Sequence, residues 1–74
     1  MKPIPKKKGS TRILALDQAT HTTGWSIFDD TKLVSYGTFI TNLKDEIARD
    51  NTIKMWMISM IDGWKPDYIA LEGI

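Results

Sequence analysis

The sequence predicts an α/β fold in which one helix covers a small mixed sheet. Two apolar runs, residues 12–17 and 67–72, have the length and composition of buried parallel strands. Between them, residues 24–29 and 33–40 are expected to form an antiparallel hairpin, and residues 43–63 have the apolar spacing of a helix. A helix that joins parallel strands makes a right-handed crossover in nearly all cases. The predicted element order is β-β-β-α-β, with strands ordered 3-2-1-4 and the fourth strand parallel to the first.

The first strand reads Ile-Leu-Ala-Leu over residues 13–16, without alternation between apolar and polar residues. A continuous apolar run indicates burial on both faces of a sheet. Residues 68–71, Tyr-Ile-Ala-Leu, predict the same for the fourth strand. One helix covers only one face, however, and the outer edge of the fourth strand is left free. We therefore expect residues 12–74 to be the N-terminal portion of a longer domain, in preference to a unit that a partner chain completes.

The second and third strands are predicted from alternation and from turn chemistry. Trp25 and Ile27 fall on one face of residues 24–29, and Ser26 and Phe28 fall on the other. Residues 29–32, Asp-Asp-Thr-Lys, have the composition of a turn. The third strand, residues 33–40, is rich in β-branched and aromatic side chains.

The helix is predicted from its cap and its apolar stripe. Asn42 and Asp45 resemble a capping box that would start the helix at residue 43. The methionine-rich stretch 55–60 is expected to face the core, because methionine fills irregular gaps. Gly63 is expected to end the helix near that residue.

Size and composition restrict the class of protein. The chain has 74 residues, a length that allows one small domain at most. Its formal net charge is +1. It contains no cysteine, which excludes disulfides and thiolate metal sites. No apolar run approaches the roughly 20 residues that cross a bilayer, and no signal-peptide core follows the basic start. These features predict a soluble, cytoplasmic protein.

Two acidic residues, Asp17 and Glu72, end the two apolar runs. If the strands are parallel neighbours, both carboxylates emerge at one edge of the sheet, where open α/β sheets place their chemistry. Neighbouring strands lie about 4.8 Å apart, so the two groups can share a cation. Mg²⁺ prefers oxygen ligands and usually takes one or two carboxylates, with water and phosphate completing its shell. The sequence therefore predicts a divalent-metal site at Asp17 and Glu72, although a two-metal nuclease centre needs more acids than these two.

Polar and basic residues near this edge and at the N-terminus are candidates for phosphate contacts. The first twelve residues hold five basic residues and no acid, whereas the remainder has five basic against nine acidic residues. The simpler interpretation of residues 1–11 is a basic, flexible, solubilising tail, and we favour it. The candidate DNA contacts are Thr20, His21, Thr22, Lys6, Lys7 and Lys8.

Residues 14–25 resemble the first motif of RuvC-type Holliday-junction resolvases, which belong to the RNase H-like superfamily. In that family an apolar strand ends in Asp, and a loop of the same length leads to Thr-Gly and an aromatic residue, as in Thr23-Gly24-Trp25. Residues 65–72 resemble the second motif, in which a Pro-Asp pair and a strand deliver the catalytic Glu. At positions 18 and 19, Gln-Ala stands where the family has Pro-Gly, a variation similar to phage-type members.

The resemblance implies a partial RNase H-like fold and a parent enzyme that resolves four-way DNA junctions in recombination and repair. Asp17 and Glu72 would be catalytic metal ligands for Mg²⁺, with Mn²⁺ as a substitute, and a metal-activated water would attack the phosphodiester. The family's remaining two acids lie on a later helix, so we expect residues 12–74 to be inactive alone. The full-length protein would be a homodimer, acting in the cytoplasm or, if phage-encoded, in that of the bacterial host.

Two other functions are compatible with these residues. A non-catalytic module would use the same fold for DNA binding or assembly. An actin-like or sugar-kinase ATPase also begins with an Asp-x-Gly-Thr hairpin, but Ala19 replaces that glycine here, which disfavours this class.

Overall fold

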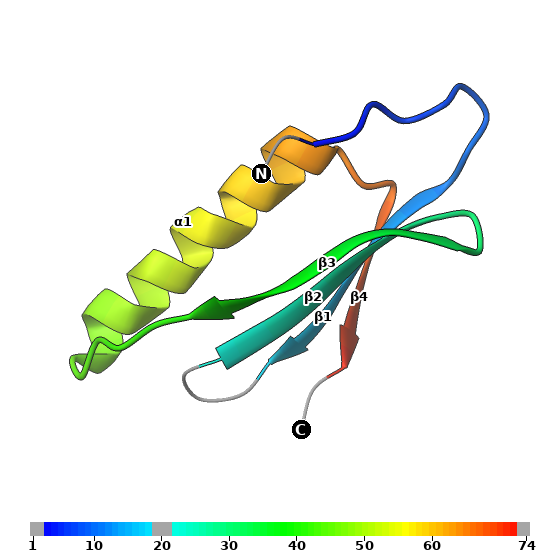
Figure 1. Ribbon diagram of the computed structural model, residues 1–74. Helices are drawn as coiled ribbons and strands as arrows, with labels where there is room; N and C mark the ends of the chain where they lie inside the picture. The colour runs from blue at the N-terminus through cyan, green and yellow to red at the C-terminus, as the bar shows by residue number, and fades with distance from the viewer. Residues whose placement is uncertain (1–2, 19–21, 73–74) are drawn as a thin grey trace.

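The computed structural model describes residues 3–18 and 22–72 (Figure 1). The elements follow the predicted order of three strands, a helix and a strand. Their bounds are β1 Arg12–Gln18, β2 Thr22–Asp29, β3 Lys32–Ile40, α1 Glu46–Trp64 and β4 Tyr68–Glu72.

The four strands form one mixed sheet in the order β3-β2-β1-β4. β1 is antiparallel to β2 and parallel to β4, and β2 is antiparallel to β3. The predicted order and the parallel pairing of the first and fourth strands are therefore confirmed. The two-residue turn between β2 and β3 places Asp30 in the left-handed region, with φ of 56°, a conformation that Asp tolerates better than most residues.

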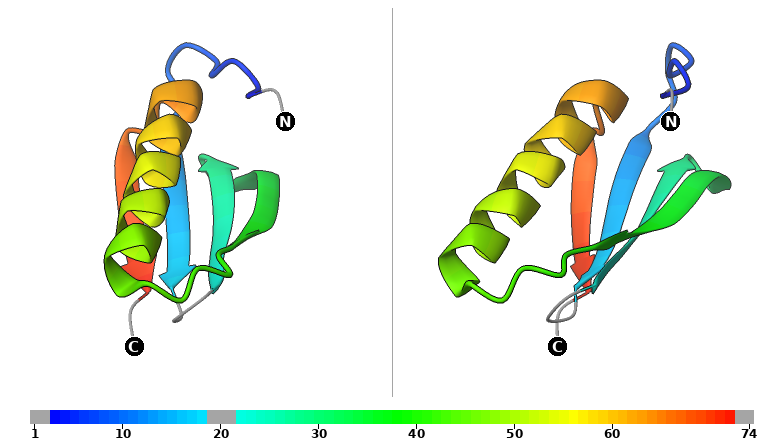
Figure 2. Two further views of the ribbon diagram at one scale, coloured as in Figure 1. Left: turned by 90° about the vertical axis from the view of Figure 1, so that its left-hand side faces the viewer. Right: turned by 60° about the vertical axis from the view of Figure 1, so that its left-hand side comes forward.

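α1 lies on one face of the sheet only, so the described residues form two layers (Figures 1 and 2). The core between the layers contains the buried side chains of Leu14, Leu16 and Ile27 from the sheet and Trp64 from α1. Each such side chain contributes about 1.5–3 kcal/mol when it is fully buried. Ile13 and Ala15 of β1 point to the other face and are half-buried. β1 is thus covered fully on one face, not on both.

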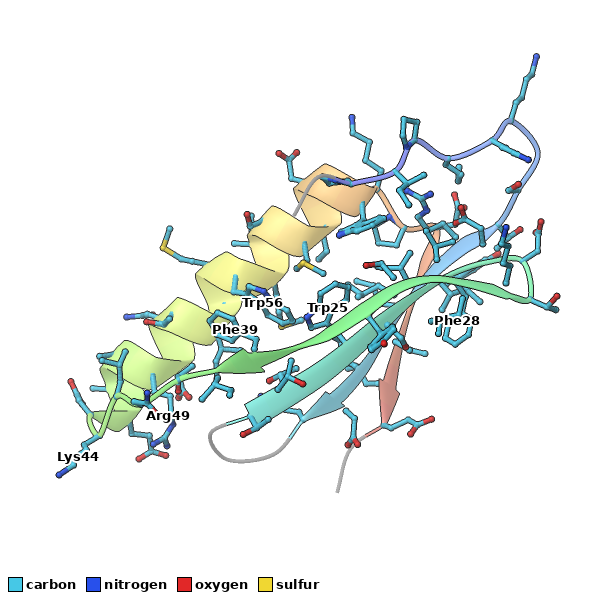
Figure 3. The ribbon with its side chains drawn as sticks, viewed as in Figure 1. Trp25, Phe28, Phe39, Lys44, Arg49 and Trp56 are labelled. Atoms are coloured by element: carbon cyan, nitrogen blue, oxygen red, sulfur yellow. The ribbon has the colours of Figure 1, made fainter. Side chains whose placement is uncertain are left out.

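Aromatic side chains fill the space between α1 and the hairpin (Figure 3). The rings of Phe39 on β3 and Trp56 on α1 are stacked, with centroids 4.7 Å apart. Trp25 on β2 packs against the core and lies directly over Gly37 of the neighbouring strand. A Cβ atom at Gly37 would stand 2.7 Å from the Trp25 ring, so only glycine leaves room for this packing.

β4 is exposed along its whole length, and the expectation that it is buried on both faces is wrong for this chain. Ile69 is 42% exposed and Leu71 is 68% exposed. The reason is its place in the sheet: β4 has β1 on one side, and no described strand lies on its other side.

The helix begins three residues later than predicted, at Glu46. Asp45 is the N-cap: its backbone is extended and its carboxylate accepts a hydrogen bond of 3.3 Å from the N–H of Ile47. The helix also runs past Gly63 to Trp64, and Lys65 ends it in the left-handed region, donating its N–H to the carbonyl of Ile61.

A buried arginine ties the start of β1 to three other segments. Arg12 is 1% exposed, and its Nε and Nη2 donate to the two carboxylate oxygens of Asp29 at 2.6 and 2.8 Å. Its Nη1 donates to the carbonyls of Ile4 and Trp64, and the guanidinium lies 5.3 Å from the centroid of the Trp64 ring. The guanidinium charge is therefore fully partnered inside the fold, as a buried charge must be.

Asp67 joins the same end of the sheet to the basic N-terminal segment. Its Oδ2 accepts the backbone N–H of Arg12 at 2.8 Å, and both its carboxylate oxygens accept from the Nζ of Lys6 at 2.8 and 2.9 Å. Ile4 and Lys6 thus contact the body of the protein. The predicted flexibility of residues 1–11 as a whole stays a prediction.

Candidate metal centre

The structure brings Asp17 and Glu72 together at the carboxyl ends of β1 and β4. The two residues are paired directly across the parallel strands. Residues that face each other in a parallel pair point to the same side of the sheet, on strands about 4.8 Å apart. Because Leu14 and Leu16 point toward α1, Asp17 stands on the opposite, uncovered face. The juxtaposition that the two motifs predicted is present.

Both carboxylates are exposed and border one open hollow of about 330 Å³. Small residues surround them on this face: Ala15 precedes Asp17 by two positions, and Gly24 and Ser26 pair with Asp17 and Ala15 from β2. Small neighbours leave the carboxylate oxygens accessible to a ligand as large as a nucleic-acid backbone.

The donor set fits one Mg²⁺ or Mn²⁺ ion. Two carboxylates at one strand edge supply the hard oxygen ligands that these ions prefer, and the exposure leaves the rest of the shell to water and phosphate. Within residues 3–18 and 22–72 no cluster of three or more potential acidic, histidine or cysteine ligands occurs. A two-metal centre therefore requires ligands beyond those that this part of the chain brings together.

The predicted DNA contacts of the loop after β1 are only partly visible. Thr20 and His21 lie outside the described residues. Thr22 is exposed at the start of β2. It lies at the same end of the sheet as Asp17, because the adjacent Thr23 pairs with Gln18. Its hydroxyl therefore lies on the side of the molecule where a metal-bound phosphate would be.

Lys6, Lys7 and Lys8 lie at the other end of the sheet from the carboxylates, just before β1 begins (Figure 1). The five residue steps from Arg12 to Asp17 span roughly 17 Å of extended strand. Lys6 is paired with Asp67, whereas Lys7 and Lys8 are exposed. A single duplex would have to lie along the sheet to meet both the lysines and the carboxylates.

Sequence reasoning missed the most strongly interacting charges of the molecule. The sequence pattern groups Arg12 with the basic N-terminal residues and Asp29 with the turn, yet the two side chains form a bidentate ion pair. Hydrogen bonds from Arg12 hold the pKa of Asp29 below its ordinary value of 3.8. The backbone N–H of Arg12 and then the Lys6 ammonium lower the pKa of Asp67 in the same way. The available signal was an arginine placed directly at the start of an apolar strand.

Comparison with known proteins adds no relative: no family model, no curated protein and no solved structure matches the chain. The resemblance to RuvC-type resolvases therefore stays an inference from the two motifs. In the described part of the chain, no helix combines the length and the apolarity that crossing a membrane requires.

Proposed function

We propose that this chain is part of a Mg²⁺-dependent, structure-specific DNA endonuclease that resolves Holliday junctions, and that Asp17 and Glu72 are its metal ligands. The observation that supports the proposal most directly is the direct pairing of Asp17 with Glu72 across parallel strands. Two apolar runs separated by a hairpin and a helix end in these residues, and the fold makes them neighbours. We further propose that the sheet and helix are the first part of an RNase H-like domain acting on four-way junctions in the cytoplasm, as a homodimer in the full-length protein.

In this proposal the residues have distinct roles. Asp17 and Glu72 would hold the cation, and the open hollow that they border would admit the phosphodiester. Thr22 lies at the same edge and offers a hydroxyl to a neighbouring phosphate oxygen. When bound, the cation supplies Lewis-acid stabilisation and lowers the pKa of water for in-line attack. The rigid strand pairing fixes the separation of the two carboxylates.

A non-catalytic module is the second candidate, and one observation favours it. The described residues bring together two carboxylates and no third potential ligand. A domain with this donor set would bind DNA or a partner through the same sheet without hydrolysing phosphodiesters.

Metal titration tests the site itself. We expect Mn²⁺ binding, followed by calorimetry or by the Mn²⁺ electron paramagnetic resonance signal, to weaken by about tenfold or more in Asp17→Asn and in Glu72→Gln, because each change removes one of two charged ligands. Asp50→Asn is the matched control, since Asp50 is an exposed acid on α1. Equal affinity in the wild type and Asp17→Asn would contradict the metal assignment.

Cleavage of a four-way junction separates the two candidates. Nicking by the chain with Mn²⁺ that is lost in Asp17→Asn, while Asp50→Asn nicks normally, would establish the endonuclease and exclude the module. Metal binding without nicking is what the two described carboxylates predict by themselves, so in that case the endonuclease proposal is judged by the metal titration alone.

A further inference from the structure

An open hollow of about 540 Å³ lies between the N-terminal segment, residues 3–11, and the turn that joins β2 to β3. Small-molecule sites in proteins have volumes of about 300–1,000 Å³, so the hollow is large enough for such a ligand. It lies at the end of the sheet opposite the metal centre, because β1 starts beside this turn, where Arg12 pairs with Asp29, and ends at Asp17 (Figure 1). The hollow also borders β3, the edge strand remote from β4, so its walls do not depend on what lies beside β4.

Hydrogen bonds at both ends hold the N-terminal segment in place as one wall of the hollow. The carbonyl of Ile4 accepts a hydrogen bond of 2.7 Å from the Nη1 of the buried Arg12. At the other end, Thr11 donates its N–H to the Oδ1 of Asp30 at 3.0 Å, and its carbonyl accepts the N–H of Asp30 at 2.7 Å. The segment and the β2–β3 turn are therefore joined directly, and the hollow between them is formed before any ligand enters.

The chain between these two attachments makes a tight turn. The N–H of Ser10 donates to the carbonyl of Lys7 at 3.1 Å, and Gly9 has a φ of 89°, which glycine adopts without steric cost. This turn places Lys7 and Ser10 on the wall of the hollow. Lys6, by contrast, is paired with Asp67.

Two ammonium groups border the hollow. Lys7 belongs to the N-terminal segment and Lys32 to the start of β3, and neither has an ion-pair partner among the described residues. Asp29 borders the hollow as well, but both of its carboxylate oxygens accept hydrogen bonds from Arg12. Asp30 is the remaining acid of the lining, and one of its oxygens accepts the N–H of Thr11. Both ammonium groups can therefore bind an anion.

The rest of the lining combines apolar side chains with hydroxyls. Ile4 and Leu33 are 50% and 48% exposed, and together with Pro5 they give the hollow an apolar side. Ser10 and Thr31 each add a hydroxyl. Apolar surface beside two cations and two hydroxyls suits a ligand that joins an apolar, ring-shaped body to a compact anion.

We propose that this hollow binds a nucleotide, with the phosphate between Lys7 and Lys32 and the base against the apolar side. Lysine binds phosphate as a point charge, and the hydroxyls of Ser10 and Thr31 can donate to phosphate oxygens. A free mononucleotide and one nucleotide of a DNA strand offer this same chemistry. The site does not require the metal centre at the other end of the sheet. If the nucleotide belongs to a strand, the hollow gives the proposed endonuclease a second contact with its DNA.

Calorimetric titration with thymidine monophosphate (dTMP), without divalent metal, tests the site. Inorganic phosphate and unphosphorylated thymidine are the two partial ligands. We expect dTMP to bind at least about tenfold more tightly than either of them, because only dTMP uses both the ammonium groups and the apolar side. Equal affinity for inorganic phosphate and dTMP would indicate an adventitious ion only and overturn the proposal, as would the absence of dTMP binding at millimolar concentration.

Two pairs of variants locate the binding. Lys7→Gln and Lys8→Gln remove the same charge from adjacent residues, but of the two lysines only Lys7 borders the hollow. We expect Lys7→Gln to weaken dTMP binding about tenfold and Lys8→Gln to change it less than twofold. Leu33→Ser should weaken dTMP binding, whereas Ile40→Ser, at an exposed apolar position at the other end of β3, should not. Equal losses within either pair, in variants with the circular dichroism spectrum of the wild type, would overturn the proposed site.

Tetrathymidylate identifies the source of the nucleotide. Tighter binding of tetrathymidylate than of dTMP, weakened in Lys7→Gln, would support the site and assign it to a DNA strand. Affinities equal to each other, and equally weakened in Lys7→Gln, would support the site and assign it to a free nucleotide. Asp17→Asn should bind dTMP as the wild type does, so failure of the metal centre and failure of this site are distinguished.

Discussion

At the scale of single residues, the molecule places its charges in two contrasting environments. Arg12 is fully buried and uses three of its nitrogens to bind Asp29 and two carbonyls. Asp17 and Glu72 are exposed at the other end of the sheet, where no described side chain neutralises them. The first arrangement stabilises the fold, whereas the second leaves two carboxylates available to a cation.

The Arg12–Asp29 pair should be one of the most sensitive positions of the fold. We expect Asp29→Ala to lower the free energy of unfolding by about 3 kcal/mol, because it leaves a buried guanidinium without its partner. Asp30→Asn is the control: Asp30 accepts one exposed hydrogen bond from the N–H of Thr11, and Asn keeps an acceptor and tolerates the left-handed backbone, so the change should cost about 1 kcal/mol or less. Urea denaturation followed by circular dichroism measures both changes. Equal effects of the two substitutions would contradict the assigned importance of the pair.

At the scale of elements, the hairpin and the helix are held together by aromatic packing that needs a glycine. Trp25 occupies the space above Gly37, between β3 and α1, and the Phe39–Trp56 stack extends this contact toward the start of the helix. The hairpin therefore supplies one wall of the core and also fixes β1 from one side. The other side of β1 is fixed only by β4, the exposed edge.

Gly37→Ala should displace the Trp25 ring. Its new Cβ atom would stand 2.7 Å from that ring, closer than any stable contact, and we expect a loss of about 1–3 kcal/mol of unfolding free energy. Gly24→Ala is the matched strand glycine, because the nearest atom to its Cβ would be an ordinary 3.8 Å away. Tryptophan fluorescence during denaturation reports both stability and the environment of Trp25. A Gly37→Ala variant as stable as Gly24→Ala would show that the ring moves without cost.

At the scale of the whole molecule, ion pairs gather at one end of the sheet, and the exposed carboxylates of Asp17 and Glu72, which have no ion-pair partner among the described residues, lie at the other. Lys6, Arg12, Asp29 and Asp67 join the N-terminal segment, β1, β2 and the approach to β4. At this end, the hydrogen bonds of Arg12 join the sheet to the C-terminal end of α1. At the opposite end, Asp17 and Glu72 border an open hollow on the face that α1 does not cover.

Acid should weaken the ion pairs of Asp29 and Asp67 and so lower the free energy of unfolding. The pKa values of Asp29 and Asp67 are lowered in the folded protein by hydrogen bonds from Arg12 and, for Asp67, from Lys6. Because the pKa of each carboxyl is lower in the folded protein, the unfolded chain binds protons more readily. The two groups therefore stabilise the fold fully at pH values well above the ordinary pKa of 3.8. This stabilisation is lost as the pH falls through the pKa values of the folded protein. We expect the free energy of unfolding to be level near neutrality with respect to these groups and to decline below about pH 4.

The double variant Asp29→Asn/Asp67→Asn tests the origin of this acid dependence. It should be less stable at neutral pH and should show a shallower decline in acid, measured by urea denaturation across the pH series. If the free energy of unfolding of the variant fell with decreasing pH as steeply as that of the wild type, other carboxyl groups would be responsible for the acid dependence.

The sequence by itself determined the order of the elements, the pairing of the first and fourth strands and the meeting of Asp17 with Glu72. These follow from local patterns: apolar runs, a short turn, a helical stripe and the handedness of the crossover. Only the tertiary structure decided the partners of Arg12, Asp29 and Asp67, the exposure of β4 and the start of α1 at Glu46. The Arg12–Asp29 pair joins residues that are 17 positions apart, so it depends on which segments meet in the fold. The burial of β4 depends on what lies on both sides of it in the sheet. Neither property is therefore encoded in the residues of the strand alone.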